Sequence, residues 1–230
     1  MILKFGRVAL VLSGVVLATA CAPTKQITDV QPTGGFLPQP ALLQSGKEGF
    51  AALSYFNSNA DWPSYTKVIL EPVTLWGGAN SKLDSVPPEK RKAFANALYG
   101  ELYNAASQRC QMVTEPSPGT LRVRFALVEA EASNPTLNTI STYVPQARIL
   151  STMAGYAFNS GAGVFTGSAT VEGYAADAET GQLLWQAVDK RAGANAIGSN
   201  TFNSWGDVDN AFKAWAKQFG ERMTKLGVCP

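Results

Sequence analysis

The chain contains no histidine, and this absence excludes several kinds of active site at once. Serine and cysteine nucleophiles are usually activated by a histidine base, so Ser-His-Asp and Cys-His arrangements are ruled out. Histidine is also the commonest metal ligand and the side chain that titrates nearest neutral pH. The cysteines are few and lie far apart, without the paired spacing of a zinc site. We therefore expect no catalytic residues, no metal site and no cofactor.

A large excess of positive charge is also lacking. The chain has 19 lysines and arginines against 17 aspartates and glutamates. Two of the basic residues, Lys4 and Arg7, belong to an N-terminal segment that we expect to be removed, which leaves equal numbers of both signs. Proteins that bind nucleic acids need a basic surface to neutralise phosphates. We therefore predict no nucleic-acid partner.

The apolar run near the N-terminus is too short for an ordinary transmembrane helix, which needs about 20 apolar residues. Lys4 and Arg7 precede an apolar stretch, Val8–Ala18, and small residues then lead into Cys21. A basic start, a short apolar region and small residues before a cleavage site are typical of a secretory signal peptide. We predict a cleaved signal over residues 1–20.

Cys21 resembles the modified cysteine of a bacterial lipobox, which is joined to diacylglycerol and becomes the acylated N-terminus. The place three residues before it holds Ala18 where a lipobox usually has leucine. The alternative is an ordinary signal peptide cut before a chance cysteine. Three acyl chains would anchor the protein firmly, because each buried methylene contributes about 0.8 kcal/mol. Ala22, in place of the aspartate that signals inner-membrane retention, implies an outer-membrane lipoprotein that faces the periplasm.

The other two cysteines, Cys110 and Cys229, form an even pair once Cys21 carries lipid. In an oxidising compartment such a pair favours a disulfide over two free thiols. Each cysteine follows a predicted helix. We expect the bond to form if both helices lie on the same face of a sheet.

The pattern of apolar residues predicts one α+β domain over residues 41–230, after a flexible tether over 21–40 that is rich in proline and glycine. The expected order is strand, helix, strand, connection, hairpin, helix. Strands are predicted at 50–56, 65–71, 111–114 and 121–127, a hairpin at 168–191 and helices from Pro88 and Trp205. We expect an antiparallel or mixed sheet with both amphipathic helices packed on one face.

The final helix carries an aromatic and aliphatic stripe at helical spacing. Its residues are Trp205, Val208, Phe212, Trp215, Phe219 and Leu226. We predict that this stripe is core and that Trp215 is its most sensitive position; the rival interpretation is an exposed docking surface.

The role of residues 134–167 is less defined by the pattern. This stretch is rich in small residues and contains a possible helix over 145–159. It is either a helix that closes over the sheet or a segment that contacts a membrane or partner.

Three stretches, "DWPSYTKVILEPV", "VEGYAADAETGQLLWQAVDKRAG" and "SWGDVDNAFKAWA", together resemble the signature blocks of an uncharacterised bacterial lipoprotein family, DUF3313. The resemblance runs from about Phe36 to Leu226. It implies an envelope lipoprotein and brings no established activity or catalytic residues.

Without histidine, paired carboxylates are the remaining chemistry for catalysis. The candidates are Glu129 with Glu131, two apart on a strand, and Asp177 with Glu179 in a turn. We hold two hypotheses. The first is a noncatalytic outer-membrane lipoprotein that binds a protein partner or supports an envelope complex. The second is a carboxylate-dependent hydrolase acting on cell-wall or surface glycan.

The lipobox interpretation predicts that Cys21→Ser releases the protein from the outer membrane, because the variant has no thiol to acylate. The check is cell fractionation together with the intact mass of the native protein. A variant that still partitions with the outer membrane, beside a native protein without acyl mass, would show that the interpretation is wrong.

Overall fold

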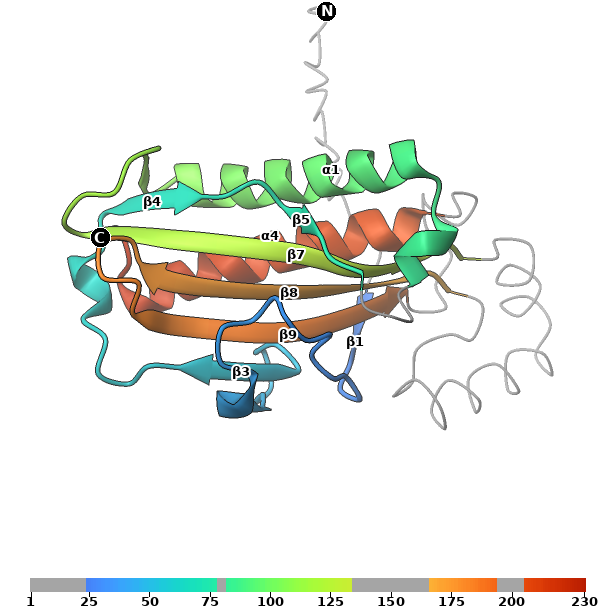
Figure 1. Ribbon diagram of the computed structural model, residues 1–230, viewed down its shortest axis with the longest axis horizontal. Coiled ribbons are helices and arrows are strands. Elements are labelled where there is room, and N and C mark those ends of the chain that lie inside the picture. Colours follow the sequence, from blue (N-terminus) through green and yellow to red (C-terminus); the bar gives the residue numbers. More distant parts are fainter. Residues whose placement is uncertain (1–23, 78–81, 134–165, 194–204) are drawn as a thin grey trace, which may run out of the picture.

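The computed structural model describes residues 24–77, 82–133, 166–193 and 205–230. These residues form a mixed sheet with two long helices on one side (Figure 1). The strands are β1 Thr24–Ile27, β2 Gln44–Ser45, β3 Leu53–Phe56, β4 Lys67–Leu70, β5 Thr74–Leu75, β6 Gln111–Met112, β7 Thr120–Glu131, β8 Ser168–Asp177 and β9 Leu183–Gly193. The helices are α1 Pro88–Ser107 and α4 Gly206–Leu226, with short 3-10 turns at Pro40–Leu42, Trp62–Ser64 and Lys82–Ser85.

The nine strands of the described chain lie in the order β2-β3-β9-β8-β7-β4-β6, with β1 also paired to β9 and β5 to β7. The three long strands β7, β8 and β9 are antiparallel neighbours. β4 is parallel to both β6 and β7. The parallel pairing is possible because α1 comes after β4 and before β6 in the chain and carries the chain back along the sheet. The expected α+β class with a mixed sheet is confirmed.

Both helices pack against the same face of the sheet, as predicted, and they also pack against each other (Figure 1). α1 begins at Pro88, whose missing N–H costs nothing in the first turn. α4 ends at Gly227, which has a φ of +72° and closes the helix in the left-handed conformation. The apolar side chains of β7 that face these helices are Leu121, Val123, Phe125 and Leu127.

A bulge in β7 accounts for the break in its alternating pattern. The pairing of β7 with β8 shifts between Leu127 and Glu129. Because of this extra residue, Leu127 and Ala130 both belong to the core beneath the helices. Glu129 and Glu131 consequently face the opposite side of the sheet.

The segment predicted as a flexible tether over 21–40 is packed against the domain from Thr24 onwards. β1 pairs with the end of β9, and Phe36 and Leu37 are buried on the face of the sheet that the helices leave open. Phe36 lies 5.6 Å from Tyr174 between ring centroids, and Trp76 donates a hydrogen bond of 2.9 Å to the carbonyl of Gly34. The tether prediction is wrong here, because strand pairing, buried apolar side chains and hydrogen bonds together hold the segment against the sheet.

The β8–β9 hairpin has the predicted turn. The carboxylate of Asp177 accepts hydrogen bonds from the backbone N–H groups of Glu179 and Thr180, at 3.1 and 2.8 Å. Gly181 follows with a φ of +73°, which a residue with a side chain rarely adopts. Asp177 therefore has a structural role in the turn.

Cys110 and Cys229 form a disulfide, as expected from two helices that share one face. Their Cα atoms are 5.2 Å apart, and 119 positions separate them in the sequence. The bond joins the chain after α1 to the chain after α4. None of the described helices is both long enough and apolar enough to cross a membrane.

Replacing both cysteines, as Cys110→Ser with Cys229→Ser, should lower the free energy of unfolding by about 2–5 kcal/mol, because the unfolded chain then loses a long closed loop. Thermal melting of the variant and the native protein gives the comparison. Alkylation before mass spectrometry supplies the control: two reactive thiols in freshly folded native protein would contradict the disulfide.

Candidate functional site

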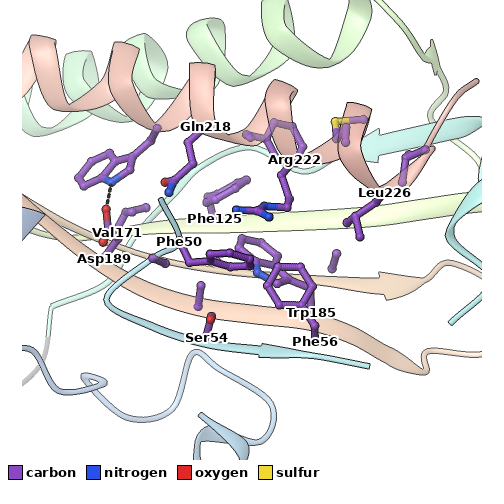
Figure 2. A pocket seen from close by; sticks show the side chains of 18 of the residues that line it. Phe50, Ser54, Phe56, Phe125, Val171, Trp185, Asp189, Gln218, Arg222 and Leu226 are labelled. Atoms are coloured by element: carbon purple, nitrogen blue, oxygen red, sulfur yellow. Dashed lines mark hydrogen bonds between the residues drawn. The ribbon is translucent and has the colours of Figure 1, made fainter. Parts of the chain in front are cut away.

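A half-open cavity lies between the sheet and the second half of α4 (Figure 2). It contains about 790 Å³ of empty space, counting its open mouth. Aromatic rings dominate its lining and come from six separate parts of the chain. They are Phe50, Phe56, Trp62, Phe125, Trp185, Trp215 and Phe219.

A glycine shapes the floor of this cavity. Gly173 of β8 pairs with Phe125 of β7, and a Cβ atom at Gly173 would lie 2.6 Å from the ring of Phe125. The ring therefore lies close to the sheet, 5.9 Å from the ring of Trp185 and 5.7 Å from that of Phe219. Small residues also occupy neighbouring positions at Ala175 and Ala187, so the sheet leaves room beneath α4.

The mouth is bordered by residues 46–52, which we call the strap. The carbonyl oxygen of Gly49, a residue with a φ of +78°, accepts hydrogen bonds from Gln218 at 2.9 Å and from Arg222 at 3.1 Å. The carbonyl of Phe50 accepts another from Gln26 at 2.7 Å. These bonds hold the strap against α4 and β1.

Arg222 places a positive charge among the rings. Its guanidinium lies 3.7 Å from the ring centroid of Phe50 and 5.9 Å from that of Phe56, within the range of cation–π attraction. No carboxylate in the described part of the chain forms an ion pair with it, and Glu221 exerts only a longer-range attraction. Burial lowers the pKa of Arg222, although arginine stays charged at any ordinary pH.

Asp189 lies at one end of the cavity and is 3% exposed. Its carboxylate accepts hydrogen bonds from the indole of Trp215 at 2.7 Å, the backbone N–H of Ala52 at 2.9 Å and the guanidinium of Arg191 at 3.1 Å. The side chain of Gln26 donates a further one. These four donors satisfy the carboxylate. Asp189 thereby attaches α4, the strap and β1 to β9, the strand that carries it.

The carboxylates predicted as a possible catalytic pair lie on the opposite face of the sheet. Glu129 accepts hydrogen bonds of 2.7 Å from both Lys190 and Thr170, and Lys82 contacts Glu129 at 3.4 Å and Glu131 at 2.8 Å. Burial alone would raise the pKa of Glu129, but Lys190, Thr170 and Lys82 together hold it below its ordinary value. A general acid in glycoside hydrolysis needs a raised pKa, which this arrangement opposes.

The second candidate pair, Asp177 and Glu179, serves the hairpin turn. The backbone N–H of Thr180 is the main cause that lowers the pKa of Asp177. Tyr65 donates a hydrogen bond of 3.1 Å to the same carboxylate, and burial together with Asp177 raises the pKa of Tyr65 to about 12. Neither Asp177 nor Tyr65 is poised to exchange a proton near neutral pH, because the pKa of Asp177 is lowered and that of Tyr65 is raised.

Cys21 and the possible helix over 145–159 lie outside the described residues, so both remain predictions. Among the residues that are described, no three histidine, cysteine or carboxylate side chains gather where a metal ion could bind.

The predicted core stripe of α4 is confirmed for Val208, Phe212 and Trp215, which are at most 4% exposed. Phe219 and Leu226 are only half-buried and line the cavity. The cavity was not predicted, because its lining comes from α4 and from strands and loops that are separate in the sequence. The sequence feature that could have indicated the cavity is the set of small residues on β8 and β9, which pair with strand positions that carry large aromatic rings.

The fold is that of an α+β domain closed by a disulfide, which indicates folding outside the cytoplasm. The family model described as "Protein of unknown function (DUF3313)" matches residues 32–219, so the chain belongs to this family. The resemblance noted from three stretches of sequence is thereby confirmed. No curated protein matches the chain.

Solved structures with a similar arrangement are distant. The PelC dodecamer from Paraburkholderia phytofirmans is 10% identical, with 73% of this chain and 95% of that chain covered and a TM-score of 0.39. A DUF4136 family protein from Bacteroides thetaiotaomicron is 12% identical, with 77% and 96% covered and a TM-score of 0.36.

Trp215→Phe should lower the free energy of unfolding by about 1–3 kcal/mol, because a buried carboxylate then loses a hydrogen-bond donor while most of the ring contacts remain. Trp215→Ala should cost about 3–5 kcal/mol, since the packing is lost as well. Denaturant unfolding measures both values.

The control is the same Trp215→Phe change in an Asp189→Asn background. If the hydrogen bond causes the loss, the two substitutions are not additive. Native stability in Trp215→Ala would reject the core assignment.

Proposed function

We propose that this protein is an outer-membrane-anchored lipoprotein that faces the periplasm and acts by binding, without catalysis. Its expected partner is a protein of the cell envelope, or an envelope complex that it supports. The acylation site is Cys21, and the body of the protein is the disulfide-closed domain. The disulfide supports the compartment, since such bonds persist where thiols are oxidised.

The observation that carries the binding role is the aromatic cavity beneath α4. Binding sites are typically concave and apolar with a few polar groups, and this cavity has that character. Aromatic side chains and arginine are also the residue types that dominate protein interfaces. The acidic side chain of the lining is Asp189, and its carboxylate already accepts four hydrogen bonds from within the fold.

The alternative is a hydrolase that uses the carboxylates Glu129 and Glu131 on cell-wall or surface glycan. Lys82 and Lys190 form ion pairs with these carboxylates. The lowered pKa of Glu129 disfavours the protonated form that a general acid needs. The described cavity that could accept a ligand lies on the other face of the sheet. Binding is therefore the better-supported proposal.

To test the binding role, a photoreactive amino acid can be placed at Ser54, which lines the cavity, and activated in intact cells. We expect the Ser54 position to form a covalent adduct with one recurring envelope protein. The matched control is Lys213, an exposed position on α4 outside the cavity, which should give no such adduct. Equal adducts from both positions would contradict the cavity as the binding site.

The noncatalytic part has a separate test. Purified protein incubated with peptidoglycan or surface glycan should release no soluble sugar. Sugar release by the native protein that disappears in Glu129→Gln would establish the hydrolase instead.

A further inference from the structure

We propose that the cavity beneath α4 binds the single alkyl chain of an anionic amphiphile, with Arg222 holding its carboxylate or phosphate head. This inference goes beyond the proposed function: the amphiphile occupies the interior of the cavity, and the envelope protein of the proposed function contacts the domain around it. It names the chemistry of the ligand, the orientation of the ligand in the cavity and the residue that selects the charge of its head group.

The apolar part of the argument is the lining. On the side of the cavity towards the end of α4, the wall is formed by apolar side chains from α4, β7, β8, β9 and the turn before β4. They include Leu121, Ala175, Trp185, Leu226 and Val228. A hydrocarbon chain gains from leaving water for such a wall at about 25 cal/mol per Å² of buried area. None of these side chains carries a charge that would have to be paired.

The charged part of the argument is Arg222. The guanidinium is partly withdrawn from water, as its lowered pKa reflects, and no described carboxylate forms an ion pair with it. One of its five N–H donors is used on the carbonyl of Gly49, and its face covers the ring of Phe50. A partly buried cation in this state is stabilised by an anion, and arginine offers a planar fork that matches carboxylate and phosphate.

The ends of the cavity set the direction of the ligand. Figure 2 shows Arg222 of α4 between Asp189 of β9 on one side and Leu226 of α4 on the other. At the other end, the donors around Asp189 are already engaged by its carboxylate and are not available to an anionic head. The head is therefore held at Arg222 and the alkyl chain runs towards Leu226.

The strap supplies an entrance that needs little rearrangement. Its contacts with Gln218 and Arg222 are two hydrogen bonds to a single carbonyl, that of Gly49, and one stacked ring, that of Phe50. An anionic head that binds Arg222 competes with these contacts only. The buried anchor of the strap, from Ala52 to Asp189, stays in place.

The experiment uses the full mature chain with Cys21→Ser, exported on a cleavable signal peptide so that the disulfide forms. Laurate, dodecyl phosphate and dodecanol share one alkyl chain and differ in the head group. Titration is followed by calorimetry and by tryptophan fluorescence, to which Trp185 in the lining contributes. We expect laurate or dodecyl phosphate, or both, to bind at least about tenfold more tightly than dodecanol. Whichever of the two anions binds more tightly identifies a carboxylate or a phosphate as the natural head.

Variants then assign the charge selection to one residue. Arg222→Met should reduce binding of the anions to the level of dodecanol and leave dodecanol unchanged, whereas Arg222→Lys should retain part of the difference. Lys213→Met removes a positive charge from the exposed side of α4 and should change nothing. Melting curves establish that each variant is folded.

Two results would overturn the proposal: dodecanol binding as tightly as the anions, or no binding of any of the three compounds. Both comparisons use the native side chains, so they stand even if Arg222→Met does not fold. Because these measurements need neither anchoring nor a protein partner, their failure leaves the crosslinking and fractionation results of the proposed function unaffected.

Discussion

The buried carboxylate of Asp189 is the interaction on which the arrangement of this domain most depends. A charge in this position is costly unless every oxygen lone pair finds a donor. The donors come from α4, the strap, β1 and β9, four parts of the chain that are far apart in sequence. The requirement to satisfy one group therefore fixes how the last helix, the N-terminal strand and the mouth of the cavity are placed. Local structure alone would leave these placements open.

The sheet is covered on both faces, but by different means. The helices bury one face with large side chains at helical spacing, in the pattern expected of amphipathic helices. The segment between β1 and β3 covers the other face with few apolar side chains and several buried polar groups. Glu172 there is fully buried and accepts a 2.7 Å hydrogen bond from the hydroxyl of Thr33, and Gln186 accepts one from the backbone of Gln39. Such a cover involves specific hydrogen bonds as well as apolar area.

This difference explains what the sequence could reveal. The helices, the alternation along β7, the hairpin turn and the cysteine pair follow from periodicity and residue chemistry within short stretches. The packing of residues 24–40 does not, because prolines and the glycine pair at 34–35 indicate a loop, and the segment is ordered by tertiary contacts such as those of Phe36 and Trp76. The cavity was equally hidden. It arises from Gly173 beside Phe125 and from small residues on neighbouring strands, which is a property of the register between strands and not of any one stretch of sequence.

The early start of the folded domain has a consequence for reach. β1 begins at Thr24, only three positions after Cys21, and a fully extended chain covers at most about 3.6 Å per residue. If lipid at Cys21 anchors the protein, the start of β1 would therefore lie within roughly 10 Å of the anchor, less than the thickness of one bilayer leaflet. With such an anchor, the β1 end of the domain would be kept beside the membrane surface. The anchor would then attach the domain to the membrane and also limit the distance of its β1 end from the membrane surface.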